Sequence, residues 1–126
     1  MRYVGITFVE STLYRGKSLE QFLGGRTSES GDLFVSWVEL RPTAEGVEVW
    51  HFEVPDLGDG FADLYELISV EQQRSVLVAS PDAAMQFAQA HFGASLTRWV
   101  NQSVIQDEFL DFVRAGRTPI HRLTNI

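Results

Sequence analysis

Two β-rich segments separated by a short run of turn residues constrain the fold of this 126-residue chain more than any other feature. They run from Leu33 to Arg41 and from Val47 to Val54, and both are rich in valine and aromatic residues, which favour strands. Between them, residues 42–46 (Pro-Thr-Ala-Glu-Gly) are typical of turns. The pattern predicts an antiparallel hairpin with a five-residue loop.

The pairing of these two strands decides which side chains share a face. If Arg41 pairs with Val47, one face is apolar enough to be buried, and it carries Phe34, Val38, Leu40, Trp50, Phe52 and Val54. The opposite face is then mixed, and it carries Leu33, Val35, Trp37, Glu39, Val47, Val49, His51 and Glu53. A shift of one residue would exchange faces between the strands, so the assignment depends on this pairing.

The rest of the chain predicts a single α+β domain over residues 1–126, with an antiparallel sheet of about five strands. The other predicted strands are Tyr3–Val9, Leu64–Val70 and Ser75–Ala79. A short helix is predicted over residues 18–23, because Ser18 and Gln21 have the spacing of a capping box and two glycines follow.

Most of the helix content is predicted near the C-terminus. Ser80, Pro81 and Asp82 form a typical helix start, and Gly93 provides a stop. A second helix is predicted to begin at Ser103 and to bury a stripe made of Ile105, Phe109, Phe112 and Val113. We expect the helices to pack on one face of the sheet and residues 117–126 to form a flexible tail.

Composition excludes several classes of function. The chain has 17 acidic residues and 10 lysines or arginines, a formal net charge of −7, so we expect no nucleic-acid partner. It has no cysteine, which rules out disulfides, thiolate ligands and a cysteine nucleophile. No apolar run is long enough to cross a membrane and no signal peptide is recognised, so we expect a cytoplasmic protein without a membrane partner.

The negative charge is concentrated in the middle of the chain. Nine acids and a single base, Arg41, lie between Glu39 and Glu71. Clustered carboxylates repel one another, so such a segment has three interpretations. It is a solvated face, a surface that docks into a cationic cleft of another protein, or a site for a cation or for carboxylate catalysis.

Two candidate sites follow from residue type and spacing. In the pairing above, His51 faces Trp37, with Glu39 and Glu53 within diagonal reach, which fits a structural cluster, a binding surface with an aromatic anchor, or a general acid–base pair. The stretch from Asp56 to Asp63 has the composition of a calcium loop but not its order of ligands. We therefore predict no metal site and no cofactor.

The stretch from Ser80 to Arg117, SPDAAMQFAQAHFGASLTRWVNQSVIQDEFLDFVRAGR, contains a helix that starts at Ser-Pro, a Trp-Val-Asn turn and a closing Asp-Glu-Phe helix. With the small, acidic, cysteine-free character of the chain, it resembles the immunity proteins of contact-dependent growth inhibition and related polymorphic toxin systems. The resemblance implies a non-enzymatic cytoplasmic protein that binds one cognate toxin domain, often a basic nuclease, and blocks its active site. It supplies no binding residues.

We accordingly predict a toxin-neutralising protein that docks an acidic surface over the active site of a basic toxin, with Trp37 or Trp50 as anchor. The predicted partner-binding residues are Trp37, Glu39, Glu48, Trp50, His51, Glu53, Asp56, Asp59, Asp63 and Glu66. The alternatives are a small hydrolase-like enzyme that uses His51 with Glu39 or Glu53, a metal-dependent module at Asp56–Asp63, and a generic acidic protein-interaction domain.

Overall fold

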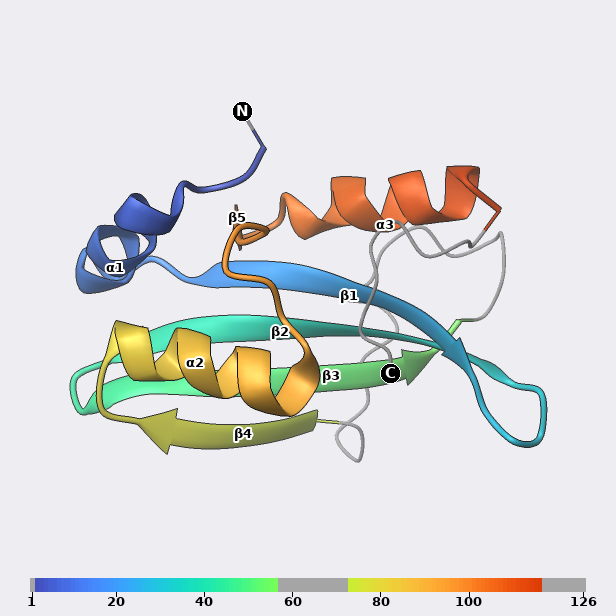
Figure 1. The fold of residues 1–126 in the computed structure, drawn as a ribbon, viewed down its shortest axis with the longest axis horizontal. Helices are drawn as coiled ribbons and strands as arrows, with labels where there is room; N and C mark the ends of the chain where they lie inside the picture. Colours follow the sequence, from blue (N-terminus) through green and yellow to red (C-terminus); the bar gives the residue numbers. More distant parts are fainter. Residues whose placement is uncertain (1, 57–72, 117–126) are drawn as a thin grey trace.

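The computed structural model describes residues 2–56 and 73–116 (Figure 1). In this part of the chain the fold is α+β, as predicted, with five antiparallel strands in the order β4-β3-β2-β1-β5 and three helices. In chain order the elements are α1 (Ile6–Tyr14), β1 (Leu19–Thr27), β2 (Leu33–Thr43), β3 (Gly46–Pro55), β4 (Gln73–Val78), α2 (Pro81–Phe92), β5 (Val100–Asn101) and α3 (Ile105–Arg114).

The central hairpin is confirmed, but its pairing is one residue away from the prediction. Arg41 pairs with Glu48 instead of Val47, because Pro42 and Thr43 extend β2 and leave a turn of only two residues. Thr43 closes this turn: its hydroxyl donates to the carbonyl oxygen of Gly46 at 3.0 Å and accepts from the amide of Glu45 at 3.2 Å. Local hydrogen bonding of the threonine therefore sets the register.

In the observed register both faces of the hairpin carry apolar residues, and both are buried. Val38, Leu40, Val47 and Val49 join one core cluster with residues of α1 and α2. Trp37, Phe52 and Val54 point the other way and join a second cluster with residues of α3. The prediction that the helices pack on one face is therefore wrong: α2 lies across β2 and β3 (Figure 1), whereas α3 covers the opposite face.

The N-terminal predictions are wrong in both elements. The predicted strand Tyr3–Val9 is largely helix α1, whose buried side chains Val9, Thr12 and Leu13 have helical spacing. The predicted helix over residues 18–23 belongs to β1, in which residues 19–23 are all buried. The predicted strand Leu64–Val70 and the predicted tail 117–126 lie outside the described residues.

Polar side chains of β1 explain why its capping pattern misleads. Gln21 bonds the backbone of Ser95, accepting from its N–H at 2.7 Å and donating to its carbonyl at 2.9 Å. The Glu20 carboxylate accepts from the amide of Ser103 at 2.9 Å. Both side chains therefore fasten later loops to a buried strand. The prediction instead gives Gln21 to a helix cap together with Ser18.

The C-terminal helices begin and end close to the predicted residues. In α2 the Ser80 hydroxyl accepts from the amide of Ala83 at 3.2 Å, and Gly93 ends the helix with a φ of 75°. In α3 the predicted stripe is buried at Ile105, Phe109 and Phe112. Ser103 does not cap α3 with its side chain, contrary to prediction; the helix begins at Ile105.

Replacing Gly46 with alanine tests the tight packing of the hairpin turn. Gly46 has a φ of 149°, and a Cβ there would clash with the backbone carbonyl of Val78. We expect a loss of about 2–4 kcal/mol in the free energy of unfolding, measured by urea denaturation. Gly16→Ala is the control, because Gly16 also has a positive φ but its Cβ would meet open space, and it is expected to cost about 1–2 kcal/mol. Equal losses of unfolding free energy in the two variants would contradict a clash at position 46.

Candidate protein-binding surface

The predicted binding residues do not form one surface. Because side chains alternate along a strand, Glu48 and Trp50 lie on the α3 face of the sheet, while His51 and Glu53 lie on the face of α1 and α2. Glu39 pairs with Trp50 and shares its face. The acids of the hairpin are therefore divided between two faces instead of gathered on one.

Trp37 cannot be the anchor of a docking surface. Its side chain has no solvent exposure and its ring stacks on Phe52 with centroids 5.0 Å apart. Asp56 is half-buried, and its amide donates to the carbonyl of Leu33 at 2.9 Å. The other predicted residues, Asp59, Asp63 and Glu66, lie outside the described residues.

On the α3 face, the acids of the hairpin are engaged by their neighbours. Arg41 donates two hydrogen bonds to the buried Glu39 carboxylate, at 2.9 and 3.0 Å, and this contact raises the pKa of Arg41. The Arg41 guanidinium lies 4.4 Å from the ring centre of Trp50, whose Nε1 donates to Glu48 at 2.9 Å. This cluster ties Trp50 to the sheet, so Trp50 is a weaker anchor than an exposed tryptophan.

The predicted acid–base pairing of His51 with Glu39 is wrong. His51 pairs with Val38 across the strands, and its ring stacks on Phe92 with centroids 4.3 Å apart. Glu53 shares its face, and the Glu53 carboxylate receives two hydrogen bonds from Arg26, at 2.6 and 2.8 Å. Within residues 2–56 and 73–116, no three histidine, aspartate or glutamate side chains are placed to hold a metal ion.

Most of the basic side chains that the structure describes are neutralised by nearby carboxylates. Carboxylates lie within 4 Å of five arginines: Arg2, Arg26, Arg41, Arg98 and Arg114. The described acids that have no such ion pair include Glu10, Glu45 and Asp82, all of them exposed. The charge presented to solvent is therefore mainly negative, although Arg15 and Lys17 after α1 are also exposed.

These three acids border two grooves along α1. One groove, of about 510 Å³, lies between the end of α1, the β2–β3 turn and the start of α2, with Tyr14, Pro42 and Glu45 in its lining. The other, of about 340 Å³, lies between α1 and α2 and is lined in part by Glu10 and Asp82. Acidic groups thus line both grooves.

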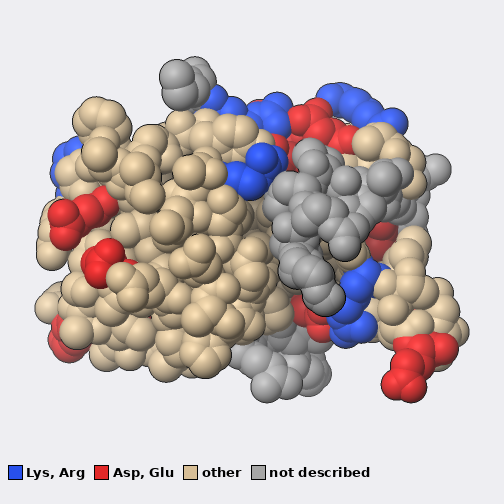
Figure 2. All heavy atoms as spheres, viewed as in Figure 1, with Lys and Arg blue, Asp and Glu red and all other residues tan. Residues whose placement is uncertain are grey.

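An exposed row of side chains on α1 connects the two grooves. Ile6, Glu10 and Tyr14 are four residues apart and therefore lie along one side of the helix. Tyr14 is 70% exposed and Ile6 is 46% exposed. We call Ile6, Glu10, Tyr14, Glu45 and Asp82 the seam surface. Figure 2 shows that the surface over α1 and α2 is largely uncharged, with both acidic and basic side chains at its α1 end.

The seam surface was not predicted from the sequence, because the β-branched residues of segment 3–9 favour a strand. The signal was present in the spacing of the segment. Val9, Thr12 and Leu13 fit one buried helical side, while Ile6, Glu10 and Tyr14 fit an adjacent exposed side. If residues 6–14 are treated as a helix, Glu10 and Tyr14 are neighbours on its exposed side.

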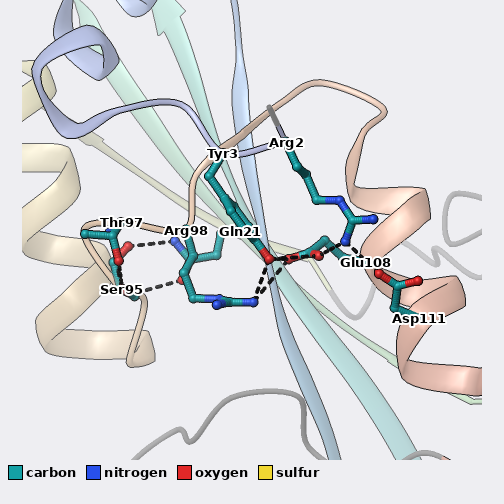
Figure 3. A network of polar contacts seen from close by, with 8 residues as sticks. All are labelled: Arg2, Tyr3, Gln21, Ser95, Thr97, Arg98, Glu108 and Asp111. Carbon is teal, nitrogen blue, oxygen red and sulfur yellow. Dashed lines mark hydrogen bonds and ion pairs between the residues drawn. The ribbon is translucent and has the colours of Figure 1, made fainter. Parts of the chain in front are cut away.

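A second polar cluster fastens the N-terminus to α3 (Figure 3). The Glu108 carboxylate is only 3% exposed; Arg2 donates to it at 2.5 Å and the Tyr3 hydroxyl at 2.9 Å. Arg98 donates to the Tyr3 oxygen at 2.7 Å and lies over its ring. Asp111 also binds Arg2, at 2.7 Å. We call these five residues the Glu108 cluster; its contacts are those of a structural clasp.

The Glu108 cluster gives stability a defined dependence on pH. Burial raises the pKa of Tyr3, and its hydrogen bond to Glu108 raises it further. An unfolded tyrosine ionises near pH 10, so this contribution to stability is complete below about pH 10 and is lost as the pH rises through the folded pKa. Tyr3→Phe is expected to reduce the loss of unfolding free energy that follows as the pH rises above about 10. Urea denaturation below and above this pH measures the loss. Tyr14→Phe, at an exposed tyrosine, serves as the control and should lose as much unfolding free energy as the wild-type chain.

Comparison of the chain with protein-family models, with curated proteins and with solved structures gave no match. Among the described residues, no helix has the length and apolar character needed to cross a membrane.

Proposed function

We propose that this chain is a binding protein that docks its seam surface onto a basic protein. The observation that carries the proposal is the exposed Tyr14 between two grooves lined by Glu10, Glu45 and Asp82. These three carboxylates have no ion pair with a basic side chain in the described structure. Aromatic side chains commonly anchor interfaces, and complementary charge selects the partner. The resemblance to immunity proteins supports a toxin domain as the partner.

Binding of this kind would inhibit the partner by occlusion. Tyr14 and Ile6 would bury apolar area, while the carboxylates steer the approach of a cationic cleft. In a nuclease such a cleft is built to hold phosphates, and carboxylates at the seam surface would replace them there. The proposal therefore needs no chemistry from the chain itself.

The test is recovery of the partner by the tagged chain from its own cells at low salt, followed by measurement of binding with the purified partner. We expect a basic protein whose association rate falls at least about tenfold between 50 and 500 mM salt. Stoichiometric addition of the chain should also abolish the partner's activity. A partner whose association does not depend on salt would overturn the proposal.

A further inference from the structure

The groove at the end of α1 is lined by an aromatic ring and a carboxylate, but by no basic side chain among the described residues. The ring belongs to Tyr14, which is 70% exposed. The carboxylate belongs to Glu45, which has no ion pair with a basic side chain in the described structure. Arg15 and Lys17 follow α1 in the chain, but neither lines this groove. The groove therefore combines groups that attract a cation and contains none of its own.

The helix ends around the groove also favour a positive charge. Tyr14 and Gly16 lie at the C-terminal end of α1, where the helix dipole is negative, and the last turn of α1 has no basic side chain. Helix α2 begins beside the groove, but Pro81 has no N–H to donate and Asp82 offsets the positive end of that helix. A cation in the groove would thus lie at an uncompensated negative helix end.

The chain itself shows which cation suits an aromatic ring combined with a carboxylate. Three of its arginines form an ion pair with a carboxylate and also lie over an aromatic ring, at 5.0, 4.4 and 4.8 Å from the ring centre. In that order they are Arg26 with Glu53 and Phe34, Arg41 with Glu39 and Trp50, and Arg98 with Glu108 and Tyr3. A planar guanidinium can stack on a ring and still donate to a carboxylate, whereas a lysine ammonium is a compact point charge.

We infer that the groove at the end of α1 binds an arginine side chain of the basic partner. The guanidinium lies against the ring of Tyr14 and donates to the carboxylate of Glu45, in the same combination as the three arginines above. Pro42 and Ala44, which also line the groove, contact the aliphatic part of the arginine side chain. The inference rests on the proposed function for the presence of a basic partner, and it names the residue that the partner inserts.

The probes are capped peptides of the sequence Gly-Gly-Arg-Gly-Gly in which the arginine is kept, or replaced by citrulline or by lysine. Citrulline keeps the shape of arginine without its charge, and lysine keeps the charge without the planar group. Each peptide is titrated into the 15N-labelled chain, and amide shifts are followed. We expect the arginine peptide to shift the amides of Tyr14, Gly16, Glu45 and Gly46 and to bind at least about fivefold more tightly than the citrulline peptide. The lysine peptide should bind more weakly than the arginine peptide.

Two pairs of variants assign this preference to the carboxylate and to the ring. Glu45→Gln should remove most of the preference for arginine over citrulline, whereas Glu29→Gln should keep it, because both acids are exposed in hairpin turns but only Glu45 lines the groove. Tyr14→Leu should weaken binding of the arginine peptide, whereas Tyr14→Phe should keep it, since phenylalanine retains the aromatic face.

Three results would overturn the inference: equal affinity for the arginine and citrulline peptides, equal affinity for the arginine and lysine peptides, or shifts confined to residues away from the groove. These outcomes are distinct from failure of the proposed function, because the titrations use no protein partner. A basic partner whose association depends on salt but is unchanged by Glu45→Gln would overturn only the inference. An arginine peptide that binds the groove, together with a partner whose association does not depend on salt, would overturn only the proposed function.

Discussion

Glu108→Ala is expected to lower the free energy of unfolding by about 3–5 kcal/mol, because it leaves cations without their buried counter-charge. Glu108 is almost completely buried and holds Arg2, Tyr3 and Arg98 together. Removing one partner of a buried ion pair costs more than the pair contributes, since the remaining charges stay partly desolvated. The N-terminal segment before α1 should also lose its attachment to α3.

Asp111→Ala separates this effect from a general loss of negative charge on α3. Asp111 binds the same Arg2 and also Arg114, but its side chain is 40% exposed. Ion pairs with that exposure contribute about 0–1 kcal/mol. Urea denaturation of the two variants measures the difference, and hydrogen exchange at the amides of residues 2–4 reports on the clasp. Similar losses in both variants would mean that the Glu108 cluster has no special role.

The parts of the fold that sequence predicts best are those fixed by neighbours along the chain. Both hairpin strands are predicted because valine and aromatic residues fill two short segments around turn residues. Helix α2 is predicted because Ser80 and Gly93 mark its ends. The predicted register is wrong by one residue, because Thr43 closes a two-residue turn where the turn residues indicated a five-residue loop.

The predictions for residues 3–23 are wrong because distant contacts override local preference. β-branched residues before Glu10 favour a strand, yet the helix forms because Val9 and Leu13 pack with α2 and the sheet. Ser18 and Gln21 have capping spacing, yet Gln21 and its neighbour Glu20 bind residues that lie 74 and 83 positions away. Contacts at that separation leave no local pattern in the sequence.

The candidate site, too, depends on contacts between distant residues that local sequence patterns do not show. The acidic bias of the middle segment is visible in the sequence, but the pleat of the sheet sends Glu48 and Glu53 to opposite faces. Arg26 and Arg41 then neutralise acids that look unpaired along the chain. The exposed acids that remain at the seam surface come from three separate elements, so only the folded chain brings them together.

A variant with Glu10, Glu45 and Asp82 all changed to lysine is expected to associate with the basic partner about 100-fold more slowly at low salt. The three substitutions reverse the charge along both grooves and raise the formal net charge from −7 to −1. Charge at an interface acts mainly on the approach of the partners, so the association rate should change more than the dissociation rate. Surface plasmon resonance at two salt concentrations measures both rates.

The matched control separates local charge from total charge, because it makes the same change in net charge at other exposed acids: Glu29, Asp32 and Asp107. Each set contains one acid from the first turn of a helix, Asp82 in α2 or Asp107 in α3, so the cost to helix stability is similar. The control should slow association only weakly, since its charges lie away from the grooves. If both variants slow association equally, the partner responds to overall charge and the seam surface is not its docking site.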